Sequence, residues 1–174
     1  NPYAEDANGL PQNYEVSADF KLDSIPEYTG KKIVQGYGLL AWYKDDHNFI
    51  DVTIKRTVSG SKLNPRISNE LILFGWIDCS SSTIGNNVYT LPEDINLEEN
   101  HTIRVQKKSN GFYVYLDDAT TPLITKIVKG TENNYYYGYE GYNAKYTASK
   151  ISSKPIYESY DEMLEKEQLD IVMV

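Results

Sequence analysis

Residues 91–116, LPEDINLEENHTIRVQKKSNGFYVYL, contain two short segments in which apolar and polar side chains alternate. The segments are HTIRVQKK, where Ile103 and Val105 have polar neighbours, and FYVYL, where every second residue is aliphatic or phenylalanine. A period of two is typical of a β-strand with one buried face. Because Asn110-Gly111 tolerates positive φ, we predict that the two strands form an antiparallel hairpin.

The chain before and after this hairpin also has the pattern of short strands. Residues 14–22 alternate, and in residues 49–57 an aliphatic set (Ile50, Val52, Ile54) alternates with a polar set (Asp51, Thr53, Lys55). Further strands are predicted at residues 33–43, 70–78, 123–128, 135–139 and 144–151, with loops at residues 1–13, 59–69 and 79–87. Eight or nine short strands without a helical period before residue 155 predict an all-β antiparallel sandwich.

The end of the chain has a different pattern. Ser159 and Glu162 have the spacing of a capping box, which predicts a short helix or a linker. We therefore expect a β-sandwich domain over residues 1–154 and a C-terminal helical segment or linker over residues 155–174. The apolar residues 170–174 are expected to run into a neighbouring domain.

Composition limits the partners and the size of the protein. A chain of 174 residues fits one domain with one core. With 17 basic and 25 acidic residues the net charge is -8, and no basic run is present, which argues against a nucleic acid or an anionic membrane as partner. No apolar run reaches the roughly 18 residues of a membrane span, so no membrane insertion is expected. Cys79 is the single cysteine, so it does not identify the redox compartment.

Four motifs in order resemble the concanavalin A-like jelly-roll domains that accompany bacterial glycoside hydrolases. They are YEVSADFKL, GYGLLAWY with FIDVTIKR after a polar turn, the segment from Leu91 to Asp118, and YYYGYEGYNAKYTASKIS, and they cover residues 14–153. Carbohydrate-binding modules and laminin-G-like modules share this architecture. The resemblance implies a two-sheet jelly roll of the lectin and glucanase type. It also implies a sugar-binding or accessory role, a neighbouring catalytic domain, and a secreted or cell-surface location. Asp118 stands where such domains commonly have glycine, so that turn is expected to differ.

The aromatic content suggests where a glycan would bind. Sixteen tyrosines and two tryptophans offer rings on which a sugar can stack, and nearby polar groups would bind its hydroxyls. The candidate binding residues are Trp42, Tyr43, Asp46, Asn48, Trp76, Tyr137, Tyr139 and Tyr142. The alternatives are that both tryptophans belong to the core and that residues 45–48 form an ordinary solvated turn. If Leu39 and Tyr43 face one side of their strand, strict alternation places Trp42 on the other.

The sequence offers no catalytic residue. No strand carries the alternating carboxylates of jelly-roll glycosidases, and neither a G-x-S-x-G motif nor a ligand-spaced histidine pair occurs. No cofactor is predicted, although a structural calcium ion bound by Asp19 or Asp117 is left open. His101 is expected to have a structural role.

The predicted function is therefore a noncatalytic carbohydrate-binding module of a larger, bacterial carbohydrate-active protein, which would bind a glycan in an aromatic-lined groove. One alternative is an accessory domain that packs against a glycoside hydrolase without binding sugar. A second alternative is a hydrolase whose site has no sequence signature, which paired carboxylates in a cleft would reveal.

Overall fold

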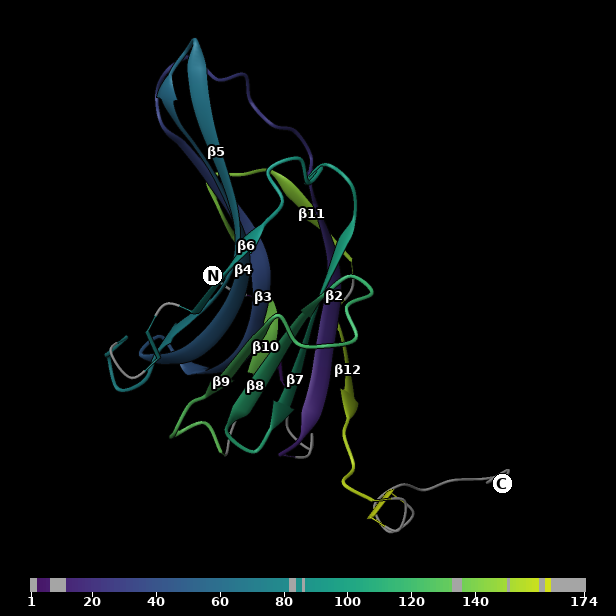
Figure 1. Ribbon diagram of the computed structural model, residues 1–174. Helices are drawn as coiled ribbons and strands as arrows, with labels where there is room; N and C mark the ends of the chain where they lie inside the picture. Colours follow the sequence, from purple (N-terminus) through teal and green to yellow (C-terminus); the bar gives the residue numbers. More distant parts are fainter. Residues whose placement is uncertain are drawn as a thin grey trace.

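Two antiparallel sheets form the protein (Figure 1). The computed structural model describes residues 3–6, 12–81, 84, 85, 87–132, 136–149, 151–159, 162 and 163; for residues 3–6, 136, 137, 139 and 140 it describes the backbone only. Sheet A has the strand order β1-β10-β3-β4-β5-β6, and sheet B has the order β11-β2-β7-β8-β9, with β12 also paired to β2. The predicted two-sheet antiparallel sandwich is confirmed.

The strands have the following bounds. Those of sheet A are β1 (Tyr3–Asp6), β3 (Ile33–Asp45), β4 (Asn48–Ser61), β5 (Asn64–Trp76), β6 (Asn87–Leu91) and β10 (Tyr136–Tyr142). Those of sheet B are β2 (Tyr14–Leu22), β7 (His101–Lys108), β8 (Gly111–Leu116), β9 (Ile124–Ile127), β11 (Tyr146–Ala148) and β12 (Ser152–Pro155).

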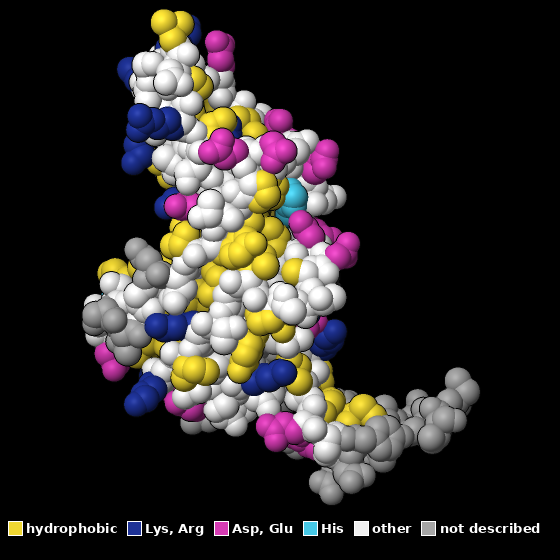
Figure 2. Space-filling model, viewed as in Figure 1, with side chains coloured by type: hydrophobic (Ala, Val, Ile, Leu, Met, Phe, Trp, Pro, Cys, Tyr) yellow, Lys and Arg dark blue, Asp and Glu magenta, His cyan; other side chains and the backbone are white. Residues whose placement is uncertain are grey.

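The core lies between the two sheets and is made of the alternating apolar residues. From sheet B, Val16, Phe20, Ile103 and Val105 are buried with the aliphatic set of β4 from sheet A. Figure 2 shows hydrophobic side chains along the seam between the sheets, on the side where β6 and β9 are the edge strands. Burial of one face of each sheet against the other is the main favourable contribution to folding.

The hairpin predicted from residues 91–116 is confirmed. β7 and β8 pair from Ile103 and Leu116 to Lys108 and Gly111. The turn differs in detail, because the positive φ of 53° falls on Ser109 and not on the Asn110-Gly111 pair.

Trp42 was expected as a candidate binding residue, and the structure contradicts this. A register shift between Leu40 and Trp42 places Ala41 in a β-bulge, so that Leu39 pairs with Val52 and Trp42 with Ile50. Because a bulge adds one residue, both Leu39 and Trp42 face the core. The Trp42 side chain is completely buried and cannot stack on a sugar.

Other segments also differ from the prediction. Residues 59–69 are not a loop, because β4 and β5 continue as a hairpin up to the pair Ser61 and Asn64. β1 lies in residues 1–13, which were predicted to be a loop, and β6 begins at the end of the predicted 79–87 loop, where no strand was predicted. Of the strand expected over residues 144–151, only Tyr146–Ala148 is a strand, β11, and β12 follows it at Ser152–Pro155. The two pair with different parts of β2.

The described C-terminal residues contain the predicted capping contacts. The Glu162 N–H donates to Ser159 Oγ at 3.1 Å, and the Glu158 N–H donates to Glu162 Oε2 at 2.7 Å. The tail, residues 170–174, lies outside the described residues. No helix in the described part of the chain is long and apolar enough to span a membrane.

Candidate functional site

Sheet A is curved, and the hollow side of β3, β4 and β5 faces away from sheet B (Figure 1). On this outer face the register aligns side chains from neighbouring strands in rows. One row contains Gly38, Thr53, Ile72 and Val88, and the next contains Tyr142, Gly36, Lys55 and Glu70. A pocket of about 370 Å³ occupies this face, and it is lined by Asp51, Thr53, Lys55, Glu70, Ile72, Phe74, Val88 and Tyr142.

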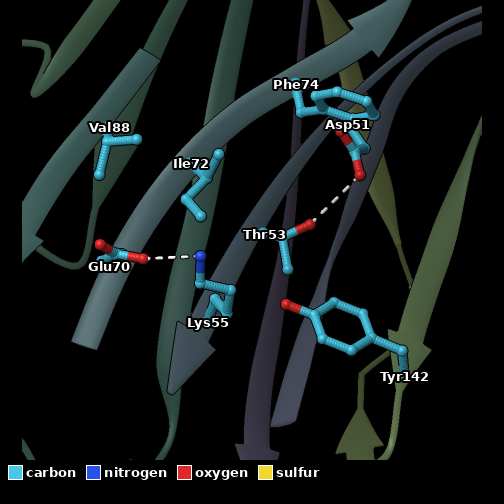
Figure 3. Close-up of a pocket in the computed structure, with 8 residues that line it drawn as sticks. All are labelled: Asp51, Thr53, Lys55, Glu70, Ile72, Phe74, Val88 and Tyr142. Carbon is cyan, nitrogen blue, oxygen red and sulfur yellow. Dashed lines mark hydrogen bonds and ion pairs between the residues drawn. The ribbon is translucent and has the colours of Figure 1, made fainter. Parts of the chain in front are cut away.

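The polar groups of the pocket come from β4 and β5. Lys55 Nζ lies 2.8 Å from Glu70 Oε2 across the two strands, and Thr53 Oγ1 donates to Asp51 Oδ2 at 3.3 Å. Figure 3 shows both interactions on the floor of the pocket. The described lining of the pocket holds one cation, Lys55, and two carboxylates, Asp51 and Glu70. The pocket therefore offers hydrogen-bond donors and acceptors with a negative balance.

Tyr142 forms one wall of the pocket, and the glycines of β3 make room for its ring. A Cβ atom on Gly36 would lie 2.3 Å from Tyr142 Cζ, so the ring lies directly on the Gly36 backbone. Gly38 also lacks a side chain in the adjacent row. In Figure 3 the Tyr142 hydroxyl points toward the strand that carries Thr53 and Lys55. The Tyr142 side chain is 36% exposed, so part of it is accessible from the pocket.

A row of aromatic residues extends the pocket toward one end of the sheet. Tyr43 pairs with Phe49, which pairs with Trp76, so the three rings lie on neighbouring strands of the outer face. The Phe49 and Trp76 rings are stacked with centroids 6.2 Å apart, and the Phe49 and Phe74 rings meet edge to face at 6.3 Å. Phe74 belongs to the pocket, so the row and the pocket form one continuous surface.

The polar turn beside this row is held by its own hydrogen bonds. The Tyr43 hydroxyl donates to Asp46 Oδ1 at 2.6 Å, and this hydrogen bond raises the pKa of Tyr43 to about 12. Asn48 Nδ2 donates to Asp45 Oδ1, and Asn48 Oδ1 accepts from the Asp78 N–H, each at 2.9 Å. The Asn48 amide and one Asp46 oxygen therefore stabilise the turn, as in the alternative of an ordinary solvated turn.

The structure brings several of the predicted residues together on one face and leaves others elsewhere. Tyr43, Trp76 and Tyr142 share the outer face of sheet A, with Asp46 and Asn48 at its end. Tyr137 and Tyr139 belong to β10, but their side chains lie outside the described residues.

Sequence reasoning missed most of the pocket. The residues it did not propose as a site are Phe49, Asp51, Thr53, Lys55, Glu70, Ile72, Phe74 and Val88. A signal was present in residues 49–57, because the polar set opposite an aliphatic core face must point outward. That pattern could not show that this outer face is concave or which residues of β5 and β6 lie beside it.

The candidate calcium ligands make hydrogen bonds within the protein. Asp19 Oδ1 accepts from Thr102 Oγ1 at 2.6 Å, and Asp117 accepts from the Thr102 N–H and faces His101 Nδ1, each at 2.9 Å. His101 Nε2 lies 3.1 Å from the Asn96 carbonyl oxygen, so the imidazole ring links a loop to the end of β8. Among the residues that the structure describes, no three metal-binding side chains are grouped.

Solved structures with the same arrangement of strands are known. Sheep galectin-11, in complex with glycerol, superposes with a TM-score of 0.58 at 10% identity, over 88% of this chain and 98% of the galectin. The carbohydrate-binding module CBM66 from Bacillus subtilis gives 0.56 at 11% identity, over 88% and 92%. The alginate lyase AlyA1 from Zobellia galactanivorans gives 0.52 at 11% identity, over 85% of this chain and 64% of the lyase.

The chain has the concanavalin A-like jelly-roll fold. This confirms the fold class that the motifs predicted. At about 10% identity these similarities establish the fold alone, since the same jelly roll is found in lectins, binding modules and enzymes. No protein-family model and no curated protein sequence matches the chain.

Proposed function

We propose that the protein is a noncatalytic carbohydrate-binding module that binds a neutral glycan on the concave outer face of sheet A. The observation that carries the proposal is the combination of aromatic rings and paired polar groups on one open surface. The rings of Tyr142 and Phe74 lie on opposite sides of a floor that carries Thr53, Lys55 and Asp51. Such a surface suits a sugar, which offers apolar CH faces and hydroxyl groups together.

The charge of the pocket supports a neutral ligand over an acidic one. The lining of the pocket has two carboxylates, Asp51 and Glu70, and one cation, Lys55, so its charge balance is negative. A uronate or sulfate group in this pocket would meet that charge, and like charges at close range cost binding free energy. The CBM66 module, which shares this fold, is named as a carbohydrate-binding module, and this agrees with the proposal.

The experiment is a panel of neutral and acidic poly- and oligosaccharides tested against the isolated chain, with and without calcium, by isothermal titration calorimetry. We expect saturable binding to at least one neutral glycan, which Tyr142→Ala and Thr53→Val weaken. Tyr113→Ala is the matched control, because Tyr113 lies on β8 in sheet B, away from the pocket. If Tyr113→Ala weakens glycan binding as much as Tyr142→Ala and Thr53→Val do, a site on sheet A is contradicted.

A glycoside hydrolase is the second candidate, because two carboxylates, Asp51 and Glu70, line the same pocket. They lie on neighbouring strands, four residues apart along the strand direction, so ideal sheet spacings place their Cα atoms about 14 Å apart. This Cα separation is longer than the range of about 6.5–9.5 Å that separates the carboxyl groups of inverting glycosidases, so the hydrolase is the weaker candidate. Release of reducing sugar from a glycan of the panel, abolished by Asp51→Asn, would support this candidate over the binding module.

The cellular location of the protein and its neighbouring domain are also part of the proposal. We place the module in a secreted or cell-surface bacterial protein beside a catalytic domain. The alternative is an accessory domain whose concave face packs against that neighbour without binding sugar. A folded chain that binds no glycan of the panel would favour this alternative.

A further inference from the structure

The end of the β4–β5 hairpin projects from the sandwich as an isolated ribbon (Figure 1). β3 pairs with β4 only up to Val58, and β6 pairs with β5 only up to Asn69. Beyond these positions β4 and β5 pair with each other alone, through Ser61 and Asn64. At a rise of about 3.4 Å per residue, the turn stands roughly 13 Å beyond the last residue paired to β3.

The apex of this ribbon is Leu63, whose side chain is 97% exposed. Single exposed aliphatic residues are common on protein surfaces, but this one stands at the outermost point of a projecting turn. All residues from Gly60 to Arg66 are exposed. An apolar side chain in this position is free to enter an apolar phase before any other part of the protein reaches it.

Basic residues lie on the end of the hairpin and on the loop beside it. Lys62 and Arg66 are on the hairpin itself, and Lys31 and Lys32 follow Gly30, whose added Cβ would lie 3.6 Å from Lys62 Cβ. The four cations are exposed, and Glu27 is the one acidic residue in the two segments, residues 27–33 and 59–66. Figure 2 shows dark blue side chains around the yellow end of the molecule. Although the net charge of the chain is -8, the end of the β4–β5 hairpin and the adjacent loop are therefore basic.

The neighbouring loop holds the ribbon in place. The Tyr28 hydroxyl donates to the Gly60 carbonyl oxygen at 2.6 Å, and Gly30, with φ of 95°, brings the chain against Lys62. An isolated two-stranded ribbon is marginally stable by itself, so this contact stabilises the projecting conformation.

We propose that this tip is a docking surface for an anionic lipid bilayer, with Leu63 entering the headgroup region and the four cations lying at the anionic headgroups. An exposed aliphatic side chain at the apex, with cations on the hairpin and the adjacent loop, matches the two favourable contributions to interfacial binding, apolar insertion and attraction to anionic lipid. An acidic polysaccharide fits less well, because it has no apolar interior for Leu63. The apex stands roughly 13 Å beyond the last residue paired to β3, which is more than the Debye length of about 8 Å at physiological ionic strength, so repulsion from the acidic body is reduced at the apex.

The test is co-sedimentation of the chain with vesicles of phosphatidylcholine alone or mixed with phosphatidylserine, at low and at physiological salt. We expect binding to the mixed vesicles only, and weaker binding at higher salt. Leu63→Glu is expected to lower the partition coefficient by about tenfold or more, and Lys31→Ala/Lys32→Ala by about fivefold per charge. Thermal melting should be unchanged, since these side chains are exposed.

Two variants control for apolar surface and for charge elsewhere. Ile127→Glu alters another exposed aliphatic residue, 54% exposed on β9, and Lys129→Ala/Lys145→Ala removes two exposed cations outside the tip. Equal loss of binding in these controls would overturn the proposal, and so would equal binding to both kinds of vesicle. Binding to dextran sulfate without binding to vesicles would overturn it in favour of an acidic polymer. The groove on sheet A takes no part, so these results are independent of glycan binding.

Discussion

The Tyr14 hydroxyl, on β2 of sheet B, donates a hydrogen bond of 2.6 Å to the carbonyl oxygen of Ala41 on β3 of sheet A. Ala41 is the extra residue of the β-bulge, whose backbone groups are not all used by the strand ladder. The hydrogen bond therefore satisfies a buried carbonyl group at the position that turns Trp42 into the core.

Tyr14→Phe is expected to lower the free energy of unfolding by about 1–2 kcal/mol, because it leaves the buried carbonyl oxygen of Ala41 without this donor. Urea unfolding followed by circular dichroism measures the change. Tyr113→Phe is the matched control, since Tyr113 is only partly buried on the outer face of sheet B. Equal losses in the two variants would show that the Ala41 contact has no special part in stability.

The fluorescence of the two tryptophans should differ in emission wavelength and in quenching by a solvent-borne quencher. Trp42 is fully buried, whereas Trp76 is 38% exposed beside Phe49. In Trp76→Phe the remaining fluorescence should be at short wavelength and resist acrylamide quenching. In Trp42→Phe the remaining fluorescence comes from Trp76, and acrylamide should quench it readily. Trp42→Ala should cost about 3–5 kcal/mol of stability, so loss of glycan binding in that variant would report unfolding and not a lost contact.

Strong quenching of the Trp42 emission would contradict the bulge at Ala41. It would mean that strict alternation holds along β3 and that Trp42 faces water. The sequence allowed both arrangements, which is why the structure was needed to place this residue.

The hairpin at residues 101–116 and the inward residues of β2 and β4 could be predicted, because alternation follows from the geometry of a single strand. The bulge at Ala41 could not, since a register shift depends on which residue of β4 pairs with Trp42. Residues 59–69 were missed because Gly60 and Pro65 are usual in loops, and here they pair with each other near the free end of a ribbon.

The candidate site could be predicted only in part for the same reason. Tyr43, Trp76 and Tyr142 were found through their aromatic rings. Lys55 and Glu70 became neighbours through the pairing of β4 with β5, which no pattern in either strand alone specifies.

Gly36→Ala should weaken glycan binding while leaving the chain folded. The new Cβ would lie 2.3 Å from Tyr142 Cζ, so the ring has to rotate away from the wall of the pocket. Loss of one stacking ring costs about tenfold in affinity. Calorimetry on the two single variants and the Gly36→Ala/Tyr142→Ala double variant measures the coupling. If Gly36 acts through the ring, the double variant binds no worse than Tyr142→Ala; additive losses would contradict this coupling.

Lys107 should make the stability depend on pH in the alkaline range. Its side chain is fully buried, and Nζ donates to the carbonyl oxygens of Ser109 at 2.5 Å and Gln12 at 3.3 Å. Desolvation lowers the pKa of Lys107 from 10.5 to about 8, although the nearby Glu132 opposes this shift. Between pH 8 and 10 the unfolded chain therefore binds more protons than the folded one. The free energy of unfolding contributed by Lys107 should rise over that interval by about 2 kcal/mol.

Urea unfolding at pH 7, 8, 9 and 10, compared between the wild-type chain and Lys107→Met, isolates this contribution. Other groups that titrate there, such as the tyrosines, are common to both proteins and cancel in the difference. Below pH 8 the charged ammonium group imposes its full desolvation cost, and the cost is relieved as the group loses its proton. The wild-type protein should therefore gain stability relative to the methionine variant from pH 8 upward. A difference that stays constant with pH would mean that Lys107 keeps its ordinary pKa despite its burial, because the two carbonyl oxygens and Glu132 compensate for the lost water.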